Sequence, residues 1–380
     1  MESLEPKKKQ IRYDDLLDIE KIKYMYYLIR KHTKNKGKLF KFEMFFSSNV
    51  TNVYNLLYNR TYKHGNYNVF LITKPKSRII MSECMVDKVI NHLLSKYVLF
   101  PLIEPQLIAT NVATRKNKGT KAALDYMQKY VNKLKENYQT IYVLKCDISK
   151  FFYSIDHEIL LNKLDNLIYD KEIFKLIEDM IRSTDNEYVN YKINNVIANQ
   201  KERIKQLKIS NEEKKLKIDE LDNIPLYNKG KGLPIGNMTS QIMAIYYLND
   251  LDHFIKEKLQ VKYYIRYMDD LVILHHDKAY LRHCLECITE EVKKVKLKIN
   301  NKTQIYDLKN GVPFLGYKFV LKDRRLHILL SSKTKKRIKN RLNKLKENPE
   351  ECLTIINNYN GYLQVADSKQ FRKSLIETYK

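Results

Sequence analysis

Two adjacent acids, Asp269 and Asp270, interrupt an otherwise apolar stretch, VKYYIRYMDDLVIL, at residues 261–274. The apolar runs on both sides predict two strands, and the acids fall at the turn of the resulting β-hairpin. Two neighbouring carboxylates repel each other and are costly to remove from water. Acids in an ordinary solvated turn usually come with Gly, Asn or Ser, so this pair indicates a functional hairpin tip.

A third acid, Asp147, ends another apolar strand, IYVLKCDI, at residues 141–148. One carboxylate at a strand end and two at a hairpin tip form a rigid set of oxygen donors, which suits magnesium. Two divalent ions about 3.5–4 Å apart can activate an attacking hydroxyl and hold a triphosphate. The three acids therefore predict a nucleotidyl-transfer site with two Mg²⁺ ions, for which Mn²⁺ could substitute.

The charge of the chain is one-sided, with 70 Lys and Arg against 44 Asp and Glu and a net charge of +26. This excess favours a polyanionic partner, nucleic acid ahead of an anionic membrane. The 29 Tyr residues suit base stacking, although an AT-rich genome would raise Lys and Tyr together. No apolar run approaches the ~20 residues of a membrane span. The N-terminus lacks a signal-peptide core, and five scattered Cys favour reduced thiols in a cytoplasmic protein.

Several further segments have sequence patterns that predict secondary structure. Residues 65–83 predict a basic β-hairpin, and residues 85–100 predict a helix that Pro101 ends. Residues 196–221 predict a solvated helical insertion whose second helix begins at Ser210. Cys284-x-x-Cys287 could bind zinc, but Leu281, Cys284, Ile288 and Val292 follow helical spacing and no second ligand pair is near, so a buried helix face is favoured.

The ordered set of motifs resembles the palm of a reverse transcriptase. KCDISKFF, GLPIGNMTSQ and YMDD follow one another in the order and spacing of that family. The resemblance covers residues 65–320 and implies an α+β right-hand polymerase fold, with fingers, a palm containing an antiparallel sheet, and a short helical thumb. It implies fingers with an N-terminal helical extension at 1–140, palm at 141–182, an inserted fingers or helical segment at 183–231, palm at 232–325 and helical thumb at 326–380.

The resemblance also assigns roles to single residues. Asp147 and Asp269 correspond to the main metal ligands, supported by Asp270 and by the carbonyl of Ile148. Phe152 matches the ring that crowds a ribose 2′-OH and thereby selects deoxynucleotides. The other nucleotide-binding residues implied are Lys74, Lys76, Arg78, Gly236, Gln241 and Lys302. The nucleic-acid-binding residues implied are Arg115, Lys118, Asn237, Ser240, Leu315, Gly316 and Tyr317.

The glycine turn departs from the commonest pattern of the family. It reads Pro234-Ile235-Gly236, where many reverse transcriptases, including group II intron enzymes, carry Gln at the middle position. The form I-G-N-x-x-S-Q resembles enzymes of diversity-generating retroelements and some bacterial defence-associated reverse transcriptases. This branch implies cDNA synthesis from a dedicated template or structured non-coding RNA, with a primer and dNTPs, and leaves an accessory protein and a homo-oligomer open.

Other functions compete with this interpretation. Retron-like, untemplated or protein-primed DNA synthesis would use the same chemistry, and the sequence does not separate diversification from antiphage defence. An RNA-dependent RNA polymerase would have the same palm, but Phe152 argues against it. A non-catalytic RNA-binding protein is disfavoured because all three acids are present.

Overall fold

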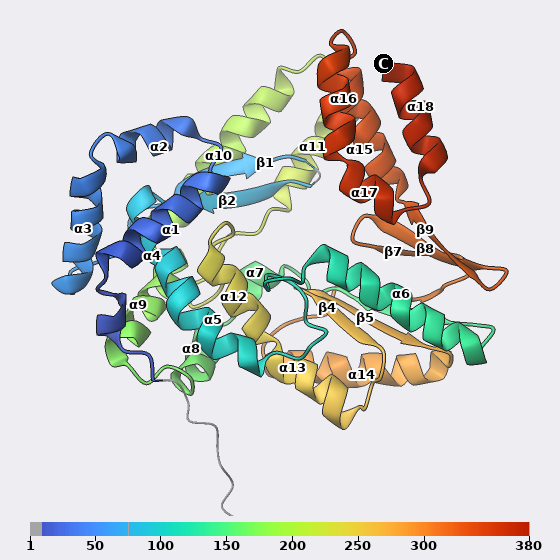
Figure 1. The fold of residues 1–380 in the computed structure, drawn as a ribbon, viewed down its shortest axis with the longest axis horizontal. Helices are drawn as coiled ribbons and strands as arrows, with labels where there is room; N and C mark the ends of the chain where they lie inside the picture. The colour runs from blue at the N-terminus through green and yellow to red at the C-terminus, as the bar shows by residue number, and fades with distance from the viewer. Residues whose placement is uncertain (1–9, 75, 380) are drawn as a thin grey trace, which may run out of the picture. The chain divides into compact units, whose positions relative to one another are not determined.

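The computed structural model describes residues 10–74 and 76–379, which form two compact units. Unit 1 contains the chain up to Ile108, Ser149–Asp252 and Val292–Lys298. Unit 2 contains Ala109–Ile148, His253–Glu291 and Ile299–Lys380. Figure 1 shows the elements of each unit with their labels.

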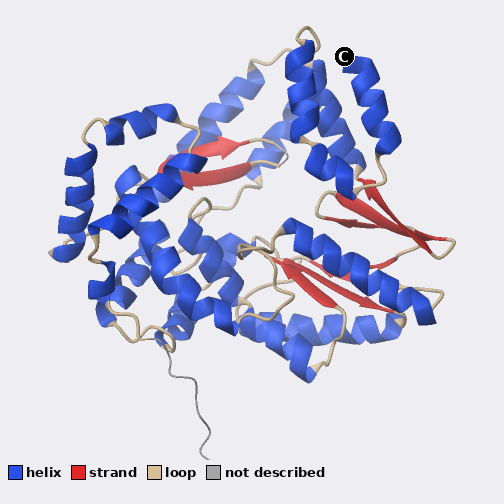
Figure 2. Ribbon diagram, in the orientation of Figure 1, coloured by secondary structure: helices blue, strands red, loops and turns tan. Residues whose placement is uncertain are grey.

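Unit 1 is mainly helical, and its strands β1 (Asn68–Ile72) and β2 (Arg78–Ser82) form an antiparallel hairpin. Figure 2 shows this hairpin among the helices of the unit. The helices are α1 (Ile19–His32), α2 (Lys36–Glu43), α3 (Phe46–Tyr58), α4 (Met85–Leu94), α5 (Phe100–Ile103), α7 (Phe151–Ser154), α8 (His157–Asp165), α9 (Lys171–Ile181), α10 (Glu187–Lys205), α11 (Asn211–Asp222), α12 (Met238–Tyr247) and α13 (Asn249–His253).

The β1–β2 hairpin confirms the strand pattern predicted for residues 65–83. Val69, Ile79 and Met81 alternate toward one face, where they join a core with residues of α10 such as Val189. Phe70, between two inward-facing residues of β1, remains 41% exposed. The hairpin therefore has one buried face and one accessible face.

The helix predicted over residues 85–100 does not end at Pro101, so that prediction is wrong. After α4 the chain makes a π-helical turn at Ser95–Leu99 and continues directly into α5, where Pro101 lies in the first turn. Proline is tolerated there because the first amides of a helix have no intrahelical acceptor. The predicted helix start at Ser210 is confirmed, since its side chain accepts a hydrogen bond from the Glu213 amide at 3.2 Å.

Unit 2 contains two antiparallel sheets and its own helices. The first sheet has the strand order β4-β5-β3-β6, and the second has the order β7-β8-β9. The strands are β3 (Tyr142–Cys146), β4 (Tyr264–Tyr267), β5 (Asp270–His275), β6 (Gln304–Asp307), β7 (Val312–Phe314), β8 (Tyr317–Lys322) and β9 (Arg325–Leu330). The helices are α6 (Thr120–Asn137), α14 (Lys278–Lys294), α15 (Ser332–Asn343), α16 (Pro349–Asn358), α17 (Asn360–Val365) and α18 (Lys369–Tyr379).

Helices cover both faces of the four-stranded sheet, as Figure 1 shows for α6 and α14. Val143 and Val272 pack with Met127 of α6 in one core. On α14, Cys284 and Ile288 are fully buried, which confirms the predicted apolar helix face. Packing on both faces explains why the strands around the acids are continuously apolar.

Residues 326–380, predicted as a helical thumb, begin with most of the strand β9. This strand pairs with β8 after a tight turn at Asp323 and Arg324, both of which have positive φ. Its inward residues, Ile328 and Leu330, belong to the unit 2 core. The helices that follow β9 share a separate core that includes Ile338 and Leu375. Across the described part of the chain, no helix has both the length and the apolar character required to cross a membrane.

Candidate active site

The YMDD segment forms the tip of the β4–β5 hairpin in unit 2. Tyr267 pairs with Asp270 at the last rung, Met268 adopts a positive φ of 57°, and Asp269 lies at the turn. The fully buried Arg266 donates a hydrogen bond from Nη1 to the Met268 carbonyl at 3.0 Å. This bond stabilises the conformation of the turn. Sequence reasoning did not assign Arg266 a role; its only signal was a charge inside an apolar strand.

The strand register brings Asp147 to the same face as Asp270. Cys146 pairs with Leu271, so the next residues outward on β3 and β5 are Asp147 and Asp270. Lys145 precedes Asp147 by two residues and faces the same side. Its Nζ lies 3.3 Å from Asp270 Oδ1. The structure therefore brings the predicted acids together and adds Lys145, to which the sequence pattern had assigned no role.

The loop before β6 holds Asp147 in place. Asn300 donates its side-chain amide to Asp147 Oδ2 at 2.8 Å and its backbone N–H to the Asp147 carbonyl at 2.7 Å. The Asp147 N–H in turn donates to Thr303 Oγ1 at 3.3 Å. Lys302, predicted to bind nucleotide, lies in this loop with an exposed side chain. Ile148 is buried and bridges to Ile299.

The carboxylates at the tip carry unbalanced negative charge. Burial, together with the nearby Asp147 and Asp270, raises the pKa of Asp269 to about 6, although its own backbone N–H opposes the rise. Burial also raises the pKa of Asp270, against the opposing effect of the Lys145 ammonium. Each shift shows that the charged form lacks the stabilisation it has in water.

The donor set fits an oxygen-preferring divalent cation. Within residues 10–74 and 76–379, no group of three or more His, Cys, Asp or Glu side chains is already arranged to hold a metal ion. Asp147 and Asp270 instead engage Asn300 and Lys145. The elevated pKa of Asp269 nevertheless indicates a partly buried anionic cluster, which a cation would stabilise.

Replacing Asp269 with Asn should stabilise the metal-free protein at neutral pH. A carboxyl whose pKa rises from 3.8 to about 6 on folding destabilises the folded state above pH 6, because unfolding lets it ionise freely. We expect a gain of about 1–2 kcal/mol in the free energy of unfolding. The gain should shrink as the pH falls from about 6 to 4, where the carboxyl is protonated in both states.

Urea unfolding with a chelator present, repeated across this pH range, measures the effect. Asp323→Asn is a matched control, because Asp323 is exposed and its positive φ of 48° tolerates Asn. A gain from Asp269→Asn that does not change with pH would contradict the charge-repulsion argument.

Two other segments with predicted nucleic-acid contacts also belong to unit 2. The loop with Arg115 and Lys118 leads into α6, where the Thr120 hydroxyl lies 3.4 Å from the Tyr267 hydroxyl of the hairpin. The Leu315–Gly316 turn joins β7 to β8, and Gly316 is exposed. Tyr317 is only 2% exposed and stacks on Tyr362, so its ring belongs to the core. Contact of these residues with nucleic acid stays a prediction.

The predicted hairpin cations and Phe152 all belong to unit 1. Lys74, Lys76 and Arg78 are exposed. Burial raises the pKa of Tyr153 to about 12, and the Arg78 guanidinium opposes this rise, which places Arg78 near α7. In α7, Phe151 is 3% exposed, whereas Phe152 is partly exposed. Phe152 is therefore the ring of this pair with surface available to a ligand.

The glycine turn attaches to β2 through its backbone. The Met81 N–H donates to the Ile235 carbonyl at 2.8 Å, and Gly236 has a φ of +132°. A Cβ at Gly236 would lie 2.9 Å from the Met81 carbonyl oxygen. Glycine is therefore required because β2 itself approaches the turn closely.

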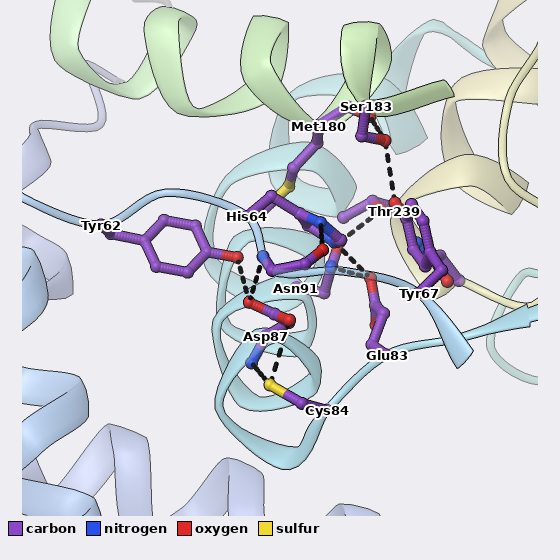
Figure 3. A network of polar contacts seen from close by, with 12 residues as sticks. Tyr62, His64, Tyr67, Glu83, Cys84, Asp87, Asn91, Met180, Ser183 and Thr239 are labelled. Carbon is purple, nitrogen blue, oxygen red and sulfur yellow. Dashed lines mark hydrogen bonds and ion pairs between the residues drawn. The ribbon is translucent and has the colours of Figure 1, made fainter. Parts of the chain in front are cut away.

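A buried polar network holds the residues after this turn (Figure 3). Thr239 donates to Asn91 Oδ1 at 2.5 Å, and the Asn91 amide donates to Glu83. The Asn237 amide donates to the Tyr67 hydroxyl at 3.3 Å. Asn237 and Ser240 are 4% and 1% exposed, and Gln241 is partly exposed. Direct contact of these side chains with nucleotide or nucleic acid stays a prediction.

Gly236→Ala should be strongly destabilising. We expect a loss of about 3 kcal/mol or more in the free energy of unfolding, because a disfavoured φ is combined with a backbone clash. Gly230→Ala is the matched control: its φ is +72° and an added Cβ would meet nothing within 4 Å. It should cost only about 1–2 kcal/mol. Equal losses in urea unfolding would contradict the close approach of β2.

Comparison with known proteins gives a family match over most of this region. Residues 63–319, more than half of the chain, match the family described as "Reverse transcriptase (RNA-dependent DNA polymerase)". This match confirms the predicted α+β right-hand polymerase fold. No curated protein matches the chain.

Two solved structures are similar at low identity. One is telomerase from Candida albicans in complex with a fragment of telomeric RNA, with 13% identity, a TM-score of 0.44, and coverage of 80% of this chain and 55% of that chain. The other is apo telomerase from Candida tropicalis truncated from its C-terminal domain, with 14% identity, a TM-score of 0.45, and coverage of 69% and 55%. The chain thus spans about half the length of these structures.

Proposed function

Because the chain belongs to the reverse transcriptase (RNA-dependent DNA polymerase) family, we propose that it synthesises DNA on an RNA template. The observation that carries the proposal is the convergence of Asp147 with Asp269 and Asp270 at the ends of β3 and β5. These acids occupy the family's motif positions and retain ionisable side chains. A decayed, purely RNA-binding scaffold would not need three partly buried carboxylates placed close enough to repel one another.

The proposed chemistry is nucleotidyl transfer from a dNTP to a primer 3′-hydroxyl. Asp147, Asp269, Asp270 and the Ile148 carbonyl would hold two Mg²⁺ ions, which activate the hydroxyl and neutralise charge on the triphosphate. Asn300 orients Asp147, and Arg266 fixes the turn that presents Asp269. Arg78, with Lys74 and Lys76, binds the triphosphate. A guanidinium suits this role better than an ammonium, because it can donate two parallel hydrogen bonds to one phosphate.

We further propose that the template is a dedicated RNA, of the kind used by diversity-generating retroelements or antiphage defence systems. The Pro234-Ile235-Gly236 turn and the I-G-N-x-x-S-Q form support this branch. The partners are then the template RNA, a primer or growing cDNA, and dNTPs. Sequencing the RNA and any cDNA that copurify with the protein would distinguish a repeat-derived template from a structured non-coding RNA.

Primer extension tests the proposed activity. Purified protein should elongate a labelled primer on an RNA template when Mg²⁺ and dNTPs are supplied. Elongation with NTPs but not with dNTPs would instead identify an RNA polymerase and would overturn the proposal.

A further inference from the structure

A cavity of about 380 Å³ lies in unit 1 and is lined by none of the residues assigned to catalysis. Its walls come from the end of α1, the connection to α2, the β1–β2 hairpin and the first turn of α4. Small-ligand sites in proteins range over roughly 300–1,000 Å³. This volume is therefore at the low end of that range and suits one mononucleotide-sized ligand.

Four of the eleven residues that line this cavity are basic. His32, Lys34, Lys38 and Lys88 line it, with Glu83 as the single acid. The Lys38 ammonium is fixed in the wall, since it donates to Ser82 Oγ at 2.9 Å and to the Glu83 carbonyl at 3.3 Å. Among the residues that the structure describes, the side chains of Lys34 and Lys88 have no hydrogen-bond or ion-pair partner. The cavity thus presents one ammonium group fixed by hydrogen bonds and two that make no hydrogen bond or ion pair with the described residues.

The surroundings of Lys88 disfavour the charged form of its side chain. Its side chain is partly buried. Burial lowers the pKa of Lys88, and the nearby Lys38 ammonium lowers it further, whereas Glu83 opposes the change. In addition, α2 and α4 both begin at the cavity, where Asn35 caps α2 and Met85 is the first residue of α4. The positive ends of two helices add to the attraction for an anion.

Glu83 does not cancel this attraction. Its side chain is 3% exposed, and it is engaged by His64 Nε2 at 3.3 Å and by the Asn91 amide (Figure 3). Burial raises the pKa of Glu83, which disfavours its charged form. The one acid of the lining therefore interacts with the protein network, and the lysines remain available.

An aromatic ring completes the lining. Phe70 is 41% exposed because it lies on the accessible face of β1, opposite the buried Val69. A ring next to lysines that make no hydrogen bond or ion pair is the combination that proteins use for single strands, in which bases stack and ammonium groups contact phosphates. A phosphate alone would not use the ring.

We propose that this cavity binds one nucleotide of a single-stranded nucleic acid, with its phosphate at Lys34, Lys38 and Lys88 and its base against Phe70. That the bound nucleotide belongs to a nucleic-acid strand rests on the proposed function. The binding itself requires no catalysis, so it can be tested separately from DNA synthesis.

Fluorescence anisotropy with a short labelled single-stranded RNA tests the proposal in the absence of dNTPs. The double variant Lys34→Gln/Lys88→Gln should weaken binding, and the slope of log Kd against log salt should fall by about 0.7 for each phosphate that the variant no longer neutralises. Lys31→Gln/Lys36→Gln removes the same charge from exposed neighbours outside the lining and should change the slope less. Phe70→Leu should weaken binding about tenfold, whereas Phe40→Leu, at a 64% exposed ring outside the cavity, should not.

Competition identifies the chemistry of the ligand. Uridine monophosphate should displace the RNA more effectively than inorganic phosphate, because only the nucleotide uses Phe70. Equal effects of the two lysine pairs, or equal competition by phosphate and nucleotide, would overturn the proposal. Loss of DNA synthesis in Asp269→Asn with unchanged RNA binding would leave it standing, which separates its failure from failure of the proposed function.

Discussion

Asp269→Asn is expected to reduce primer extension by about a thousandfold or more, because an ion held at the reacting phosphate contributes several kcal/mol to the rate. Asp269 is the acid at the hairpin tip, and its pKa of about 6 reflects burial and the proximity of Asp147 and Asp270. The amide retains the shape of the side chain but removes its charge. Single-turnover extension at saturating dNTP measures the loss directly.

The same variant should fold at least as well as the parent protein, so that a loss of activity cannot be assigned to unfolding. Asp323→Asn, the exposed control in the same unit, should extend the primer at the parental rate. Extension by Asp269→Asn within about tenfold of the parent would show that the metal site is misassigned.

Phe152→Ala is expected to relax the choice between dNTPs and NTPs by about 10- to 100-fold, since steric differences of this size contribute about 1–3 kcal/mol. Phe152 is partly exposed in α7, whereas Phe151 is buried. Removing the Phe152 ring leaves space for a 2′-hydroxyl without opening the core. The measurement is the ratio of kcat/KM for a dNTP and the corresponding NTP.

Phe151→Leu is the neighbouring control for this change. It alters a core ring that is 3% exposed, so it should lower stability and leave the sugar preference unchanged. If Phe151→Leu relaxes the preference and Phe152→Ala does not, the roles of the two rings are exchanged.

The strands that carry the acids could be predicted from the sequence because their apolar pattern is local. The β4–β5 hairpin, the end of β3 before Asp147 and the β1–β2 hairpin all follow from it. The order of the motifs then led to the polymerase fold, which the family match confirms. Local pattern and motif order were sufficient because Asp147 directly follows an apolar strand, Asp270 begins one, and Asp269 lies at the turn between two.

The interactions around the acids could not be predicted, because they depend on residues far apart in the sequence. Asn300 bonds to Asp147 across 153 positions, and no local pattern indicates that bond. Lys145 reaches Asp270 only through the register of β3 and β5. The prediction that Pro101 ends the helix failed because a π-helical turn precedes it. Pro101 therefore lies in the first turn of α5, where proline is tolerated. These features are set by tertiary packing.

The most direct test of RNA-templated DNA synthesis is to sequence the product made on an RNA of defined, non-repetitive sequence. The product predicted here is DNA complementary to that RNA, formed by the parent protein and absent with Asp269→Asn. DNA whose sequence does not depend on the supplied template would contradict templated synthesis, even if Asp269 were still required.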